Sequence, residues 1–136
     1  MGEVDRISIT VDQYEQMMIH INQCLPEEGC GLIGGRDDQA LIVFPVENDL
    51  HSPNRFRMNP LGQLRAMQQM DEVGMTMIAI YHSHPSGPKR PSITDLQEMR
   101  YPGTIYLIWS KTRVEWELHA FNIQGQQAVE IELMVR

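Results

Sequence analysis

A nearly continuous apolar stretch, Met75 to Tyr81, places the strongest limit on the folds that this chain can adopt. A strand with apolar side chains on both sides must be covered on both faces, so the stretch predicts a central strand between layers of helix. Helices are expected at about 12–24, 60–73 and 92–100, and further strands at 7–11, 30–33, 40–46, 104–110, 113–123 and 128–135. This order predicts one α/β (α+β) domain, residues 1–136, with a single mixed sheet and flanking helices.

The starts of two predicted helices carry local signals. Asp12 and Glu15 resemble a capping box for the first helix. Asn59 and Pro60 suit the N-cap and the first position of the second helix. These signals support the starts of the first two predicted helices.

The charge balance excludes some classes of partner. The chain has 11 Lys and Arg residues against 18 Asp and Glu residues, a net charge of −7. A nucleic-acid binder would carry a basic stripe, and a protein that docks on anionic lipid would carry a basic patch, so neither partner is expected. The acidic N-terminus has no signal-peptide pattern, and two cysteines do not make a disulfide framework. A cytoplasmic protein is therefore the expectation.

Two histidines follow the central apolar stretch directly. His82 and His84 are two positions apart at the end of the predicted strand, so their side chains point to the same face and can reach one metal ion. A pair of this kind is also common as ordinary polar residues where a strand ends. The pattern alone therefore leaves a metal site and a polar strand end as alternatives.

Asp95 follows at the start of the third predicted helix. Two imidazoles and a carboxylate, with the fourth position left to water, are the ligands of a catalytic zinc site. Ser92 and Asp95 also form a capping box, which by itself would explain both residues without a metal. A carboxylate has two oxygens, so the two roles are compatible.

A pair of glutamates completes the candidate site. Glu27 and Glu28 precede a Gly-rich apolar segment, and a carboxylate near a zinc-bound water can take its proton. Two glutamates after a proline are more often a solvated turn, so this pair has little weight when taken alone.

Together these residues resemble the JAMM motif of the JAB/MPN metallopeptidase family. The motif is a Glu, a long gap, His-x-His-Pro, then Ser and Asp at fixed spacing, and the sequence matches it at His82-Ser83-His84-Pro85, Ser92 and Asp95. The segment Pro26 to Gly34 also resembles the family's segment around the motif glutamate, and this resemblance identifies Glu28 as that glutamate. The resemblance extends to the segment Asn48 to Pro60 and covers nearly the whole chain.

The resemblance implies a specific chemistry. It implies a cytidine-deaminase-like JAB/MPN fold, with Zn2+ bound by His82, His84 and Asp95, Glu28 as the general base and Ser92 as a donor to the oxyanion. The implied activity is a zinc peptidase or isopeptidase that cleaves after the C-terminal Gly-Gly of a ubiquitin-like or sulfur-carrier protein. The extended tail of that partner would be able to add as a strand along an exposed edge near the site.

Two other classes remain as alternatives at this point. One is a non-catalytic MPN module that only binds a ubiquitin-like partner, which the complete motif disfavours. The other is a non-haem iron or cupin-type enzyme, which also uses histidines and a carboxylate. A cupin expects a Glu three or four residues after His-x-His, where this chain has Pro88 and Lys89.

Overall fold

The computed structural model describes residues 5–99 and 101–136 as three helices and seven strands. In chain order these are β1 (Arg6–Ile9), α1 (Val11–Cys24), β2 (Cys30–Arg36), β3 (Gln39–Val46), α2 (Pro60–Glu72), β4 (Thr76–His84), α3 (Ile93–Glu98), β5 (Ile105–Lys111), β6 (Trp116–Gln124) and β7 (Gln127–Val135). The predicted order of helices and strands is confirmed. None of the helices in these residues is long and apolar enough to cross a bilayer.

The strands form one mixed sheet in the order β1-β3-β2-β4-β5-β6-β7. The apolar stretch lies in β4, which pairs antiparallel with β2 and parallel with β5, so the predicted central position is confirmed. The sheet also closes on itself, because β1 pairs parallel with both β7 and β3. This closure was not predicted; it joins strands from the two ends of the chain, which no local pattern records.

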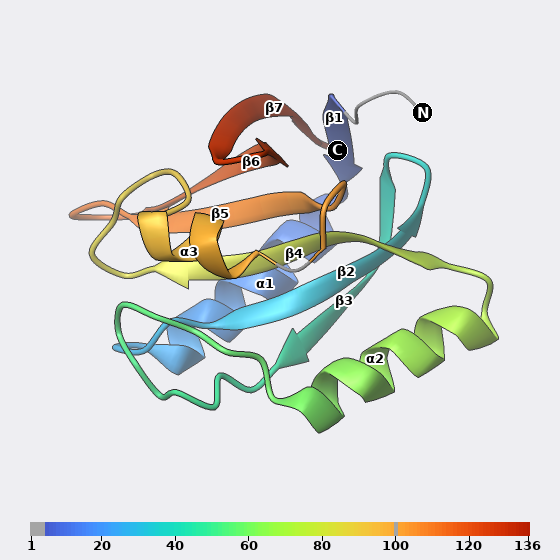
Figure 1. Ribbon diagram of the computed structural model, residues 1–136, viewed down its shortest axis with the longest axis horizontal. Coiled ribbons are helices and arrows are strands. Elements are labelled where there is room, and N and C mark those ends of the chain that lie inside the picture. Colours follow the sequence, from blue (N-terminus) through green and yellow to red (C-terminus); the bar gives the residue numbers. More distant parts are fainter. Residues whose placement is uncertain (1–4, 100) are drawn as a thin grey trace.

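Helices cover both faces of the central strands, as Figure 1 shows, with α1 on one side and α2 and α3 on the other. Met17 and Ile21 of α1 are fully buried against one apolar cluster, and Met70 of α2 is buried in a second cluster on the opposite face. Tyr81 belongs to the first cluster and Ile80 to the second, as alternation along β4 requires. The cupin alternative is excluded, because a cupin is all-β.

The start of α1 differs from the prediction. The capping box is made by Thr10 and Gln13, not by Asp12 and Glu15: the Thr10 side chain accepts from the Gln13 N–H (3.1 Å), and the Gln13 side chain accepts from the Thr10 N–H (2.9 Å). Thr10 and Gln13 match the Ser/Thr-x-x-Gln form of the box, and the Gln13 amide also donates to the Ala40 carbonyl (3.0 Å), which ties the helix to β3. The capping box thus sits two residues earlier.

The third helix is shorter than predicted. It ends at Glu98, and the predicted end at Arg100 lies outside the described residues. The start of the helix is confirmed, since Ser92 is its N-cap and forms the predicted capping box with Asp95.

Candidate active site

The end of β4 directs His82 and His84 to the same face of the sheet, the face that α2 and α3 cover. Both side chains are buried, with exposed fractions of 0% and 3%. Their Nε2 atoms lie 3.1 Å apart. The strand therefore brings two imidazoles to one point, as the spacing predicted.

Asp95 reaches the same point from α3. Its Oδ2 lies 3.0 Å from Nε2 of His82 and 3.1 Å from Nε2 of His84. The same oxygen accepts the Ser92 N–H at 2.8 Å, while the Ser92 hydroxyl oxygen accepts the Asp95 N–H at 3.0 Å. The helix cap and the convergence on the histidines thus coexist in one carboxylate.

Neighbouring groups orient the two imidazoles. Nδ1 of His84 lies 2.7 Å from the Pro88 carbonyl, to which it can only donate, so neutral His84 presents a lone pair at Nε2. The ring of Phe56 stacks on that of His82, with centroids 4.3 Å apart and planes inclined by 27°. Both rings are therefore held with Nε2 toward Asp95.

Glu28 lies next to this cluster, just before β2. Its exposed fraction is 4%, and its Oε1 has no hydrogen-bond partner among the described residues. One carboxylate oxygen of Glu28 and one nitrogen of each histidine lie within 4.8 Å of one another. Glu27, in contrast, is half-buried and pairs with His51 (3.1 Å). Burial thus separates the two glutamates that the sequence places side by side.

Burial and mutual charge shift the proton affinities of these groups. Burial raises the pKa of Glu28 to about 8, against a smaller opposing effect of His84. Burial alone would also raise the pKa of Asp95, but the two histidines outweigh it and hold that pKa well below its usual range. Burial lowers the pKa of His82. Glu28 therefore has a proton affinity suited to proton transfer near neutral pH.

These side chains fit a divalent cation. Ligands about 2.0–2.1 Å from a tetrahedral zinc lie roughly 3.4 Å from one another, and the three convergent atoms of His82, His84 and Asp95 lie 3.0–3.1 Å apart. Glu28 with the two histidines is a second possible set of ligands, whose atoms lie within 4.8 Å of one another. The set with Asp95, whose atoms lie 3.0–3.1 Å apart, suits direct ligation.

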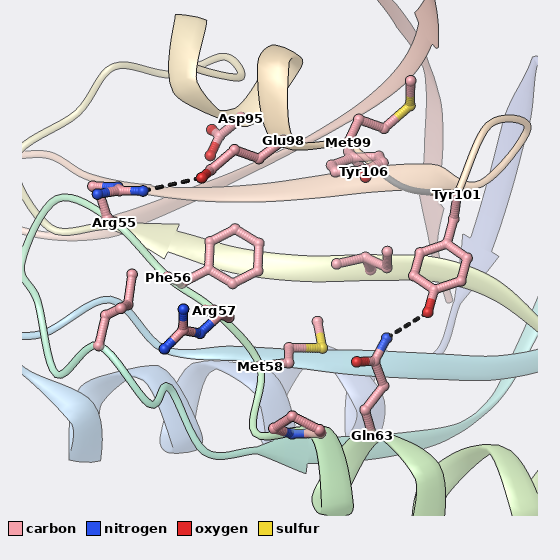
Figure 2. A pocket seen from close by; sticks show the side chains of 13 residues that line it. Arg55, Phe56, Arg57, Met58, Gln63, Asp95, Glu98, Met99, Tyr101 and Tyr106 are labelled. Carbon is pink, nitrogen blue, oxygen red and sulfur yellow. Dashed lines mark hydrogen bonds and ion pairs between the residues drawn. The ribbon is translucent and has the colours of Figure 1, made fainter.

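A cavity of about 440 Å³ opens beside the cluster (Figure 2). Ile80 and Tyr106 line it from the central strands, and Asp95 lies at its edge. Two contacts join its opposite walls: Arg55 pairs with Glu98 (3.0 Å), and the Gln63 amide donates to the Tyr101 hydroxyl (2.8 Å). The candidate site thus continues into this cavity, since Asp95 belongs to both.

Three residues at this site received no role from the sequence. Phe56 stacks on His82. Ser83, between the histidines, accepts the Gly29 N–H through Oγ (2.8 Å) and so ties β4 to the residue after Glu28. Asn48 donates to the Glu28 carbonyl (3.0 Å). The only sequence signal was that Asn48 and Phe56 fall in a segment that resembles the family.

The raised pKa of Glu28 predicts how the stability of the metal-free protein depends on pH. An unfolded Glu loses its proton near pH 4.5, whereas folded Glu28 keeps its proton to about pH 8. The folded state therefore loses stability as pH rises through this interval. Glu28→Gln has no proton to lose, so at pH 9 its metal-free form should melt roughly 5 °C or more above the wild type, and at pH 4 close to it. Thermal melts in chelator across this range test the expectation, and equal melting temperatures at pH 9 would contradict it.

The chain is similar in sequence to several known proteins. A family profile described as prokaryotic homologs of the JAB domain matches residues 10–122. The desampylase of Pyrococcus furiosus is 30% identical over 100 residues, covering 74% of this chain and 71% of that protein. The CysO-cysteine peptidase of Mycobacterium tuberculosis is 29% identical over 125 residues, covering 90% and 86%. A probable TtuB-protein conjugate cleaving protease of Thermus thermophilus is 36% identical over 88 residues, which span 64% of this chain and 59% of that protein.

Solved structures share the fold of this chain. A solution structure of a protein from Desulfitobacterium hafniense has a TM-score of 0.87 and 37% identity, covering 96% of this chain and 92% of that one. A JAB1/MPN domain protein of Archaeoglobus fulgidus has a TM-score of 0.63 at 21% identity, covering 96% of both chains, and so shares the fold. The fold, the profile match and these relatives show that the chain belongs to the prokaryotic JAB-domain family.

Proposed function

We propose that this chain is a zinc-dependent peptidase or isopeptidase that cleaves after the C-terminal Gly-Gly of a ubiquitin-like or sulfur-carrier protein. One observation carries the proposal: a buried glutamate with a raised pKa lies beside two imidazoles and a carboxylate that converge on one point. The relatives support the substrate class, since they are named as a desampylase, a CysO-cysteine peptidase and a protease that cleaves TtuB conjugates.

In this proposal each residue has a distinct task. His82, His84 and Asp95 hold the zinc, which when bound polarises the scissile carbonyl and makes water acidic enough to be deprotonated near neutral pH. Glu28 accepts the proton of the attacking water and passes it to the leaving amine. The Ser92 oxygen accepts the Asp95 N–H, so its own O–H remains able to donate to the developing oxyanion.

The substrate tail would lie in the cavity along residues 55–58. It cannot add to β4, because β4 pairs with β2 and with β5 over the residues next to the site. Arg57 and Asn59 instead direct main-chain groups toward residues 47–49, with hydrogen bonds of 2.9 and 2.8 Å. Main-chain groups alternate in direction along an extended segment, so the N–H and C=O groups of Phe56 and Met58 point away from residues 47–49 and toward the cavity that these two residues line. An extended tail can pair with this edge.

The direct test is a cleavage assay on the zinc-loaded protein. The substrate is a ubiquitin-like protein ending in Gly-Gly and extended by a peptide or isopeptide bond, and mass spectrometry identifies the product. We expect cleavage directly after Gly-Gly, abolished by a chelator. Replacing the final Gly by Val should slow cleavage at least tenfold, because a branched side chain would crowd the reacting carbonyl. A zinc-loaded protein that cleaves no member of a panel of such fusions would overturn the proposal.

A further inference from the structure

One buried side chain, Asn48, connects three parts of the molecule that meet at the site. Its Nδ2 donates to the carbonyls of Glu28 and Arg55, both at 3.0 Å. Its Oδ1 accepts the N–H groups of Leu50 (3.0 Å) and Arg57 (3.1 Å). An Asn side chain has two donor hydrogens and two acceptor lone pairs, so all of its hydrogen-bonding capacity is used.

The partners fix the orientation of this amide. Two of them are carbonyls, which only accept, and two are N–H groups, which only donate. Exchanging Nδ2 and Oδ1 would break all four hydrogen bonds. No other common side chain presents two donors and two acceptors in so short a reach, so the position requires Asn.

The segment that Asn48 organises, residues 48–59, touches both halves of the site. The main-chain carbonyl of Ser52 accepts a hydrogen bond from the Glu28 N–H at 2.8 Å. The N–H and the carbonyl of Glu28 are therefore both hydrogen-bonded to this segment. Phe56, eight residues after Asn48, stacks on His82. The segment thus adds a second link between the glutamate and the histidine, beside the pairing of β2 with β4, and Asn48 fixes the shape of that segment.

We propose that Asn48 is a positioning residue for catalysis, which holds the main chain of Glu28 in register with the His82 ring through residues 48–59. This inference rests on the proposed peptidase function. A misplacement of about 1 Å in a catalytic group can slow a reaction about 100-fold. Loss of the link between Asn48 and Glu28 should therefore slow turnover without weakening the binding of zinc or of the substrate tail.

The test uses a substitution that cuts only half of the hydrogen bonds. Asn48→Asp keeps the acceptor for Leu50 and Arg57 but loses both donors, so it separates Glu28 and Arg55 from the segment while the turn remains. We expect kcat to fall tenfold or more, with KM and zinc content within threefold of wild type. Amide hydrogen exchange of the metal-free protein should be at least tenfold faster at Glu28 and nearly unchanged at Leu50, Arg57 and the amides of β4 and β5.

The matched control is Asn54→Asp in the same segment. Asn54 is exposed, and its side-chain Oδ1, which Asp retains, accepts a hydrogen bond from the Ser52 hydroxyl. This variant adds the same charge and should cleave like the wild type. If Asn48→Asp does not fold, Asn48→Ala removes both the donors and the acceptor without adding a charge, and the same separation of kcat from KM is expected of it.

Three results would overturn the inference: wild-type kcat in Asn48→Asp, unchanged exchange at Glu28, or faster exchange at all amides together. The last would mean that Asn48 only stabilises the fold. A wild-type protein without peptidase activity would contradict the proposed function instead, and the exchange measurement would still test the link between Asn48 and Glu28.

Discussion

Glu28→Gln should keep its zinc and lose roughly two or more orders of magnitude in turnover, the usual scale for a general base. Gln has the size of Glu but cannot take a proton from water. The metal is expected to stay, because the convergent atoms of His82, His84 and Asp95 do not include Glu28. Single-turnover cleavage of a Gly-Gly fusion, with zinc measured in the same sample, gives both quantities. The variant should also bind the uncleaved fusion as tightly as the wild type does.

Glu27→Gln is the control beside it in the sequence. Glu27 is half-buried and pairs with His51 at the surface, so its replacement should leave turnover within about twofold of wild type. An inactive Glu27→Gln with a fully active Glu28→Gln would place the base one residue earlier. Full activity in both variants would remove the general-base role from this pair.

His84→Ala should lose most of the zinc. The imidazole provides one of the three convergent ligand atoms. Loss of a group that only hydrogen-bonds a metal ligand already lowers metal affinity about 10- to 100-fold, so loss of a ligand should lower zinc affinity about 100-fold or more. The wild type should carry about one zinc per chain. Metal analysis after dialysis against a weak chelator measures both, and peptidase activity should fall with the zinc.

His51→Ala serves as the control for this loss. His51 is exposed and pairs with Glu27, away from the convergent atoms, so this variant should keep its zinc. A wild-type protein that stays free of metal after zinc addition, with its fold intact, would contradict the proposed site, and so would a His84→Ala variant that binds zinc as tightly as the wild type.

The parts of this protein that the sequence predicted are those with a local pattern. The apolar stretch ending at Tyr81 predicted the central strand, because burial on both faces leaves no polar alternation. The pair Ser92 and Asp95 predicted the start of α3, because a capping box is complete within four residues. The spacing of His82 and His84 predicted a shared face, because side chains alternate along a strand.

The parts that were not predicted depend on distant segments. The capping box of Thr10 and Gln13 has the local Ser/Thr-x-x-Gln pattern and was open to prediction, whereas the contact of Gln13 with Ala40, 27 residues further on, was not. Asn48 looks like an ordinary loop residue until its contact with Glu28, 20 residues earlier, is seen. Local periodicity contains no record of such contacts. The resemblance to the family selected Glu28 over Glu27, and the roles of Glu28 and Ser92 remain predictions.

The double use of one Asp95 oxygen has a consequence for a cell that is short of zinc. That oxygen accepts a hydrogen bond from the Ser92 N–H at the start of α3 and also faces both histidines. One wall of the cavity is formed by residues that follow Asp95 in the chain, namely Glu98, Met99 and Tyr101. A metal held there would also anchor this wall, since a ligand that binds only the ordered state stabilises that state. We therefore expect copies without zinc to hold substrate poorly. Zinc-free copies would then not sequester the partner protein. The rate of cleavage would fall in proportion to the fraction of the protein that holds zinc, and the zinc-free copies would not inhibit the others.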